Sequence, residues 1–181
     1  MSKGLIGLIV AGVFAVILLF VFMGTNNNCV RQENGLKAQY SQNQNNYANY
    51  FNKLKEAAQV PGMYTSKLEQ LYKTTMEGRY GKDGSKALVQ FITEQNPNLS
   101  EAMYVNLQRI IEAGRNSFEA DQKALLDKKR VYENTLGEMP GSMFVSVLGF
   151  PKIDLDKYDI VVNQETEDAF NTKKAGPISL Q

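Results

Sequence analysis

An unbroken run of apolar residues and glycine from Gly4 to Met23 constrains the fold of this chain more than any other feature. Coiled as an α-helix, about 20 residues extend for about 30 Å, the thickness of the hydrocarbon core of a bilayer. The run is longer than the apolar region of a usual secretory signal, and no small-x-small cleavage site follows it. A lipoprotein signal would end in a Leu-x-Gly-like tripeptide before Cys29, where three asparagines stand instead. We therefore predict a retained transmembrane helix over residues 4–23, preceded by a short flank of residues 1–3.

The charges beside this segment do not decide its orientation. Lys3 and the α-amino group lie on one side, and Arg31 and Lys37 lie within reach on the other, so neither side carries the basic excess typical of cytoplasmic flanks. The sequence predicts a single-pass membrane protein and leaves open the side on which the remaining residues lie. Cys29 follows just beyond the membrane face, where acylation or a disulfide to a neighbouring subunit is conceivable. An inert thiol is the simpler interpretation.

The remainder of the chain is predicted to be all-α. Between Cys29 and Val60 there is neither proline nor a turn cluster, and apolar residues recur at spacings of three, four and seven, as on one face of a helix. These residues are Leu36, Tyr40, Tyr47, Phe51, Leu54 and Ala58. Pro61-Gly62 ends this helix. It either hinges at Asn26–Asn28 or continues the membrane segment as one rod of about 57 residues.

Further helices are predicted over residues 63–78, 85–95 and 100–136, and Ser100 is placed to cap the last of them. The segment Gly78–Gly84 is predicted to be a turn between helices. Its Gly-x-x-Gly-Lys pattern is similar to a phosphate loop only superficially, because no strand precedes it.

Beyond the break at Met139-Pro140-Gly141, a short apolar segment over residues 142–150 is expected to cap the end of the helices. Residues 151–181 are mostly polar with poor helical periodicity, and we expect an extended tail that docks in places. Taken together, the pattern predicts an antiparallel bundle of about four helices, some of them long, over residues 24–150.

Composition excludes several functions. Lys3 is the only charged residue before residue 24, so the rest of the chain carries 19 basic and 19 acidic residues and has no basic surplus for nucleic acid. With no histidine and a single cysteine, the chain cannot build a common zinc site, a thiol-imidazole pair or a Ser-His-Asp triad. We expect no cofactor, no metal, no small-molecule substrate and no catalysis.

Five residues are candidates for interactions. Tyr40, Tyr47 and Tyr50 lie on or near one face of the first predicted helix, a pattern typical of a core or of a protein interface, where each ring buries apolar area. Asp121 and Lys128 interrupt the apolar seam of the last long helix, so it is not a regular coiled coil and leaves room for a polar contact between subunits.

The C-terminal half of the predicted bundle resembles the LemA family. The motifs that carry the resemblance are Asn96-Pro97-Asn98-Leu99, Leu107-Gln108 with Asn116, Ala120-Asp121-Gln122, Arg130-Val131-Tyr132-Glu133-Asn134, Met139-Pro140 and Val147-Leu148-Gly149-Phe150. Their order and spacing are similar to those of the family over residues 96–150. The early family block with paired arginines is absent. The resemblance implies an antiparallel bundle of about four helices anchored by its N-terminus, and it does not imply a reaction.

Two functions fit these features. The first is a structural or scaffolding protein, anchored in membrane lipid, that associates with itself through helix faces. The alternative is a membrane-tethered adaptor or regulator that binds another membrane or envelope protein through the bundle or through the segment after Pro151.

Overall fold

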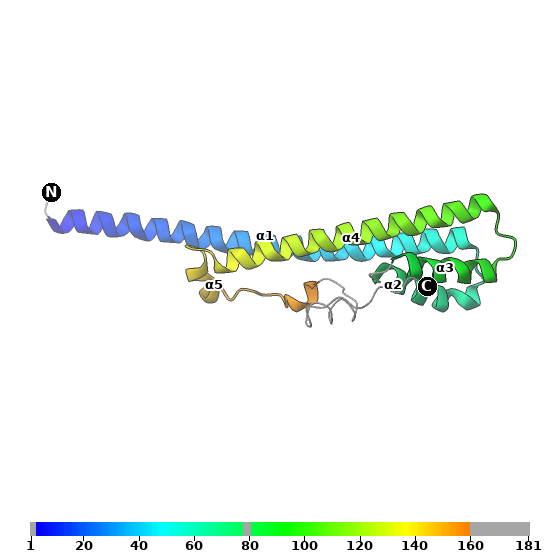
Figure 1. Ribbon diagram of the computed structural model, residues 1–181. Helices are drawn as coiled ribbons and strands as arrows, with labels where there is room; N and C mark the ends of the chain where they lie inside the picture. Colours follow the sequence, from blue (N-terminus) through cyan, green and yellow to red (C-terminus); the bar gives the residue numbers. More distant parts are fainter. Residues whose placement is uncertain (1–2, 78–80, 160–181) are drawn as a thin grey trace, which may run out of the picture. The chain divides into compact units, whose positions relative to one another are not determined.

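A computed structural model describes residues 3–77 and 81–159, with residues 81–84 described by their backbone alone. The elements are α1 (Lys3–Ala58), the 3-10 turn η1 (Gly62–Tyr64), α2 (Thr65–Glu77), α3 (Gly81–Gln95), α4 (Glu101–Gly137), α5 (Ser142–Leu148) and the 3-10 turn η2 (Asp156–Tyr158), as Figure 1 shows. The described residues form helices and their connections, with no strand, so the predicted all-α class is confirmed.

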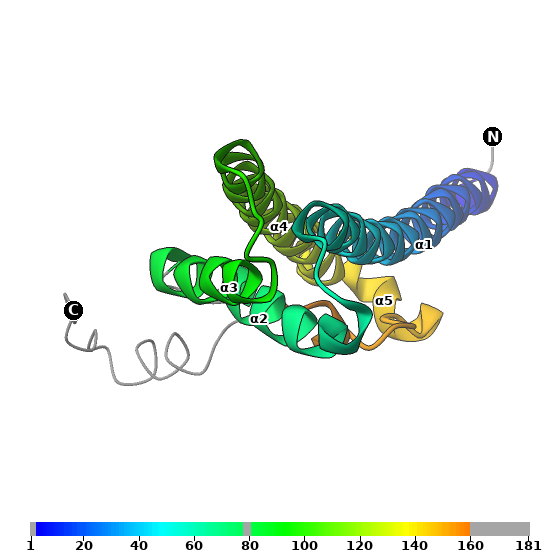
Figure 2. The ribbon, with the colours of Figure 1, turned by 90° about the vertical axis from the view of Figure 1, so that its right-hand side faces the viewer.

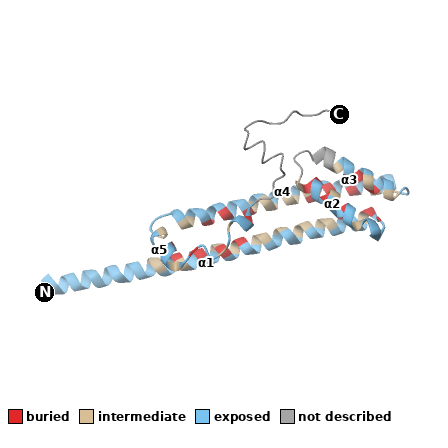
Figure 3. Ribbon diagram, turned by 90° about the horizontal axis from the view of Figure 1, so that it is seen from below, coloured by how far each residue is buried: buried red, intermediate tan, exposed pale blue. Residues whose placement is uncertain are grey.

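Helix α1 is unbroken, so Asn26–Asn28 do not form a hinge. Its N-terminal part contains an 18-residue window with a mean hydropathy of 3.2, and none of that window is buried inside the protein. In Figure 3, the ribbon of this part of the helix has the colour of exposed residues. By length and composition this part of α1 can cross a membrane, as predicted for residues 4–23. At its other end, Gln59 adopts a left-handed φ of 49°, the conformation that commonly follows a helix C-terminus.

The start of α3 corrects one prediction. The segment Gly78–Gly84 was expected to be a turn, but α3 already begins at Gly81, and residues 78–80 lie outside the described part. A glycine inside a helix costs about 1 kcal/mol relative to alanine. Helix α3 packs against α2, and in proteins such packing supplies most of the stability of a helix. The predicted cap of α4 is present, since the Met103 N–H donates to Ser100 Oγ at 3.3 Å.

The described chain divides into two compact units. Each unit contains one part of α1 and one part of α4. We call Ser41–Lys123 the bundle unit. We call the chain up to Tyr40 together with Ala124–Asp159 the strap unit. The predicted bundle of residues 24–150 therefore contributes to both units, and residues 151–159 of the predicted tail belong to the strap unit.

The bundle unit is an antiparallel bundle of four helical segments, made by the end of α1, by α2 and α3, and by the start of α4 (Figure 2). Its core consists of buried side chains from all four segments and from the turn after α1. They are Leu54, Ala58, Val60, Leu68, Tyr72, Met76, Leu88, Val89, Ile92, Leu107 and Ile111. Apart from the hydroxyl of Tyr72 and the sulfur of Met76, these side chains are hydrocarbon, so burial of apolar surface is the main force that holds the unit together.

The strap unit has only two long helical segments, which run antiparallel, since Gln32 and Glu33 of α1 contact Thr135 and Tyr132 of α4. The segment from Phe150 to Asp159, which we call the strap, packs on these helices together with α5. The core comprises Cys29, Leu36, Leu125, Tyr132, Val145, Phe150 and Tyr158. The apolar segment over residues 142–150 thus forms the helix α5, and Phe150 after it is buried in the core of the strap unit.

Candidate functional site

A buried polar cluster lies in the strap unit and is centred on Glu33, which is 4% exposed. The Tyr132 hydroxyl donates to Glu33 Oε1 at 2.6 Å, and the backbone N–H of Lys152 donates to the same oxygen at 2.7 Å. Burial of Tyr132 and its hydrogen bond to Glu33 raise the pKa of the tyrosine well above its ordinary value. One carboxylate of α1 therefore ties both α4 and the strap to the first helix.

Cys29 lies one helical turn before Glu33 and is fully buried. Burial, and secondly the charge of Glu33, raise the pKa of its thiol. A thiolate is the reactive form of cysteine, so this environment makes the sulfur unreactive. In this arrangement the sulfur is not accessible for acylation or for a disulfide to a neighbouring subunit.

A second polar contact of the strap unit involves Lys129. Its ammonium pairs with the Asp159 carboxylate at the end of the strap, while Lys129 itself is buried on α4. The neighbouring Lys128, which the sequence singled out as an interruption of the seam, is exposed instead. A shift of one residue along a helix turns the side chain by about 100°, which explains why one lysine lies on the seam and the other lies in solvent.

The predicted tyrosine stripe is used inside the chain. Tyr40 packs edge-on against Tyr158 of the strap, with ring centroids 5.5 Å apart. In the bundle unit, Tyr47 packs against Tyr72 at 5.1 Å. Tyr50 lies close to α4: a Cβ added to Gly114 of α4 would be 3.5 Å from the Cβ of Tyr50. These rings are half-buried and pack against the cores of their own units.

Asp121 is also satisfied within the bundle unit. Both of its carboxylate oxygens accept hydrogen bonds from Asn46 Nδ2, at 2.9 and 3.1 Å, and its backbone oxygen accepts one from Asn43 Nδ2 at 2.9 Å. The polar contact that the sequence suggested between subunits is thus made between α1 and α4 of one chain.

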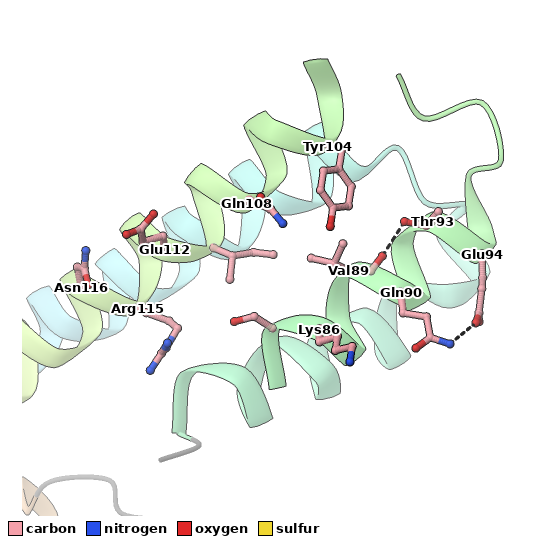
Figure 4. A pocket seen from close by; sticks show the side chains of 12 residues that line it. Lys86, Val89, Gln90, Thr93, Glu94, Tyr104, Gln108, Glu112, Arg115 and Asn116 are labelled. Atoms are coloured by element: carbon pink, nitrogen blue, oxygen red, sulfur yellow. Dashed lines mark hydrogen bonds between the residues drawn. The ribbon is translucent and has the colours of Figure 1, made fainter. Parts of the chain in front are cut away.

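The bundle unit also contains an open cleft of about 870 Å³ between α3 and α4 (Figure 4). Val89 and Ile111, both nearly buried, form an apolar floor, and Tyr104, which is 39% exposed, stands over it. Polar side chains line the two rims. They are Ser85, Lys86, Gln90, Thr93 and Glu94 on α3, and Gln108, Glu112, Arg115 and Asn116 on α4.

The chemistry of the cleft suits binding. Its ionisable rim residues are two cations, Lys86 and Arg115, and two anions, Glu94 and Glu112, so the rims have no net charge. Gln90 Nε2 donates to Glu94 Oε1 at 2.9 Å, which holds that carboxylate along the helix. An apolar floor between mixed polar rims is complementary to an amphipathic helix.

The sequence carried a signal for the buried cluster that the prediction did not use. Glu33 falls on the same helical stripe as Cys29, Leu36 and Tyr40, at spacings of four, three and four. A charged residue on an apolar stripe needs a buried partner. The cleft had no such signal, because its rims consist of ordinary surface residues.

The two places differ in what they can do chemically. The Glu33 cluster is closed and structural, whereas the α3–α4 cleft is open to a ligand. Among the described residues, no three carboxylate, thiol or imidazole groups gather so as to hold a metal ion. Comparisons of the chain with protein-family models, with curated proteins and with solved structures found no match.

Proposed function

We propose that the protein is a membrane-anchored helical scaffold that holds a partner protein and catalyses no reaction. The observation that carries this proposal is the first part of α1, whose apolar side chains make no protein core and yet continue directly into a helix that does. Leu8, for example, is 74% exposed. Apolar surface of this length is stable in lipid and costly in water, which favours a single-pass anchor.

The inventory of reactive groups supports a role in binding. The chain has no histidine, and its one cysteine is buried with a raised pKa. Among the described residues, the two buried charged side chains, Glu33 and Lys129, are engaged in contacts that fix the strap. Charged groups used to hold the fold are not free for acid-base catalysis.

The partner is best accommodated by the α3–α4 cleft. Because Tyr40, Tyr47, Tyr50 and Asp121 make contacts within one chain, they give no specific support to self-association. The cleft, with its apolar floor and neutral polar rims, favours the adaptor form of the scaffold, in which an amphipathic helix of a partner protein occupies it. The resemblance to the LemA family belongs to the same proposal, since the anchored antiparallel bundle that it implies is compatible with these elements.

Two measurements test the proposal on the full chain in native membranes. Extraction with alkaline carbonate should leave the protein in the membrane pellet, and its complete release would refute the anchor. A photo-cross-linking residue at Gln90, on the rim of the cleft, should capture a partner. The same residue at Gln70, an exposed glutamine of α2, is the matched control.

A charge on the floor of the cleft makes this second measurement specific. Val89→Lys should abolish capture at Gln90, because a lysine on the apolar floor removes the surface that an apolar helix face would cover. Capture that is equal at Gln70, or that is unchanged by Val89→Lys, would refute binding in the cleft. A product of twice the mass of the chain would identify a second copy as the occupant and restore self-association.

A further inference from the structure

An exposed apolar patch lies on α5 and on the turn before it. Met139, Met143 and Val147 are spaced four residues apart and are 71%, 62% and 76% exposed. The surrounding stretch Met139–Pro151 contains no charged residue. Isolated apolar residues are common on protein surfaces, whereas a group of them marks a contact surface.

This patch belongs to a helix that packs against α1 at the end of its apolar run. The ring of Phe144 on α5 meets the ring of Phe22 edge-on, with centroids 5.7 Å apart. Just before α5, a Cβ on Gly141 would lie 3.3 Å from Thr25 Oγ1. The residue before α5 therefore contacts α1 about one helical turn after Phe22. In Figure 1, α5 lies alongside α1. If residues 4–23 fill the hydrocarbon core, these contacts place α5 at its boundary.

The inner side of α5 is held firmly, so the exposure of the patch is not a result of loose packing. Val145 is buried in the core of the strap unit, and Phe150 is buried directly after the helix. Gly149 ends α5 in the left-handed conformation, with a φ of 70°, which a glycine adopts without strain. The N–H of Lys152 then reaches Glu33. One face of α5 is therefore fixed to the protein, and the opposite face is presented outward.

We propose that Met139, Met143 and Val147 form an interfacial patch that lies in the membrane interface and contacts lipid acyl chains. This inference rests on the proposed anchor. The occupant follows from continuity, because Phe144 contacts a residue of the apolar run that is itself assigned to lipid. Because the outward side of α5 is apolar and uncharged, it has no charge to desolvate when it enters the membrane interface.

A second membrane contact gives the anchor a property that one helix lacks. A lone spanning helix can rotate about its axis and tilt, because lipid surrounds it evenly. A patch on one side of α1 favours a single rotation, since only one orientation places it in the interface. The strap unit would then stand on the membrane in a defined orientation, and not merely be tethered to it.

The chain contains no tryptophan, so a single introduced tryptophan reports on one position. We would reconstitute the purified full chain, without other proteins, in phosphatidylcholine vesicles whose acyl chains are brominated near the headgroup. Val147→Trp probes the patch and Phe20→Trp probes the span. Val131→Trp is the matched control, because Val131 is also an exposed valine of the strap unit, one residue before the Tyr132 that contacts Glu33.

We expect Val147→Trp to emit at shorter wavelength than Val131→Trp and to lose emission in brominated vesicles, whereas Val131→Trp keeps its emission. If Phe20→Trp is quenched and Val147→Trp behaves like Val131→Trp, the interfacial patch is refuted and the anchor stands. Equal quenching of Val147→Trp and Val131→Trp also refutes it, because the contact would not be specific to the patch. If no variant is quenched and the protein does not float with the vesicles, the anchor itself fails, and the patch with it.

Discussion

Different kinds of interaction stabilise the interior of the bundle unit and the interior of the strap unit. In the bundle unit, four helical segments enclose a core of apolar side chains. In the strap unit, two long segments of the same helices α1 and α4 are covered by α5 and by the strap, which contains no α-helix, and the buried side chains include Thr25, Glu33 and Lys129. The unit with fewer helical segments is thus the one that buries charged side chains, whereas the buried Thr75 of the bundle unit donates to the carbonyl of Leu71 in its own helix.

The physical reason lies in the backbone of the strap. A helix satisfies its own backbone groups, so its burial requires only an apolar face, and apolar burial has no preferred direction. A non-helical segment brings unpaired N–H groups to the protein surface. In the strap unit, the N–H of Lys152 is paired by the carboxylate of Glu33, and the end of the strap is fixed by the pair Lys129–Asp159. These directional contacts select one position for a segment that apolar packing alone would hold less specifically.

The largest effect that separates the two units is expected from Leu107→Ala. Leu107 is fully buried in the bundle unit, and truncating a buried leucine lowers the free energy of unfolding by about 2–5 kcal/mol. Hydrogen exchange of the detergent-solubilised chain should show faster exchange in α2 and α3, with little change in the strap. Leu126→Ala, at an exposed leucine of the same helix, is the control. An equal loss of protection in both units would show that they unfold together and would break the comparison.

A smaller effect, confined to the strap unit, is expected from Glu33→Ala. The variant leaves the Tyr132 hydroxyl and the Lys152 N–H without their acceptor, and an unsatisfied buried group costs about 1–3 kcal/mol. The Lys152 amide should exchange faster while α2 and α3 keep their protection. Tyr132→Phe removes one donor and should cost about 0.5–1.5 kcal/mol.

Glu138→Ala, at an exposed glutamate of the same unit, is the control for the glutamate variant. If the Lys152 amide exchanged as slowly in the Glu33→Ala variant as in the Glu138→Ala variant, apolar packing alone would hold the strap. The distinction drawn between the two units would then be wrong.

A pair of glycines tests how closely the helices pack. A Cβ on Gly35 of α1 would meet nothing within 4 Å, whereas a Cβ on Gly114 of α4 would lie 3.2 Å from Tyr72 Oη. Gly35→Ala should therefore raise the free energy of unfolding by about 0.5–1 kcal/mol through helix propensity. Gly114→Ala should show none of this gain, because the buried Tyr72 must move. Thermal unfolding followed by circular dichroism measures both, and an equal gain at the two positions would contradict the close approach in the bundle unit.

The smallest effect at neutral pH is expected from Tyr47, a half-buried tyrosine of the bundle unit. Burial, together with the charges of Glu77 and Glu69, raises the pKa of Tyr47 from 10.0 to about 12. The unfolded chain therefore ionises this tyrosine first, so its contribution to stability is complete below pH 10 and is lost as the pH rises towards 12. Urea unfolding across this range should show a steeper loss for the unaltered chain than for Tyr47→Phe. Parallel pH profiles would mean that Tyr47 is accessible to water.

The sequence by itself determined the helices and the membrane-compatible segment of this protein. Both depend on local patterns: an apolar run of about 20 residues for the segment that can span a bilayer, and apolar side chains at helical intervals for α1 and α4. The end of α1 before Pro61 and the cap of α4 by Ser100 were predictable for the same reason, since each depends on neighbouring residues. The glycines of the segment Gly78–Gly84 misled the prediction, since α3 already begins at Gly81.

Only the tertiary structure decided which residues lie together across the chain. It placed Lys129 on the seam and Lys128 in solvent, turned the tyrosine stripe inward, and brought Glu33 to a backbone N–H more than a hundred residues away in sequence. It also opened the cleft between α3 and α4. Such pairings depend on how helix faces meet, and a repeating pattern specifies which face is buried without specifying what that face contacts.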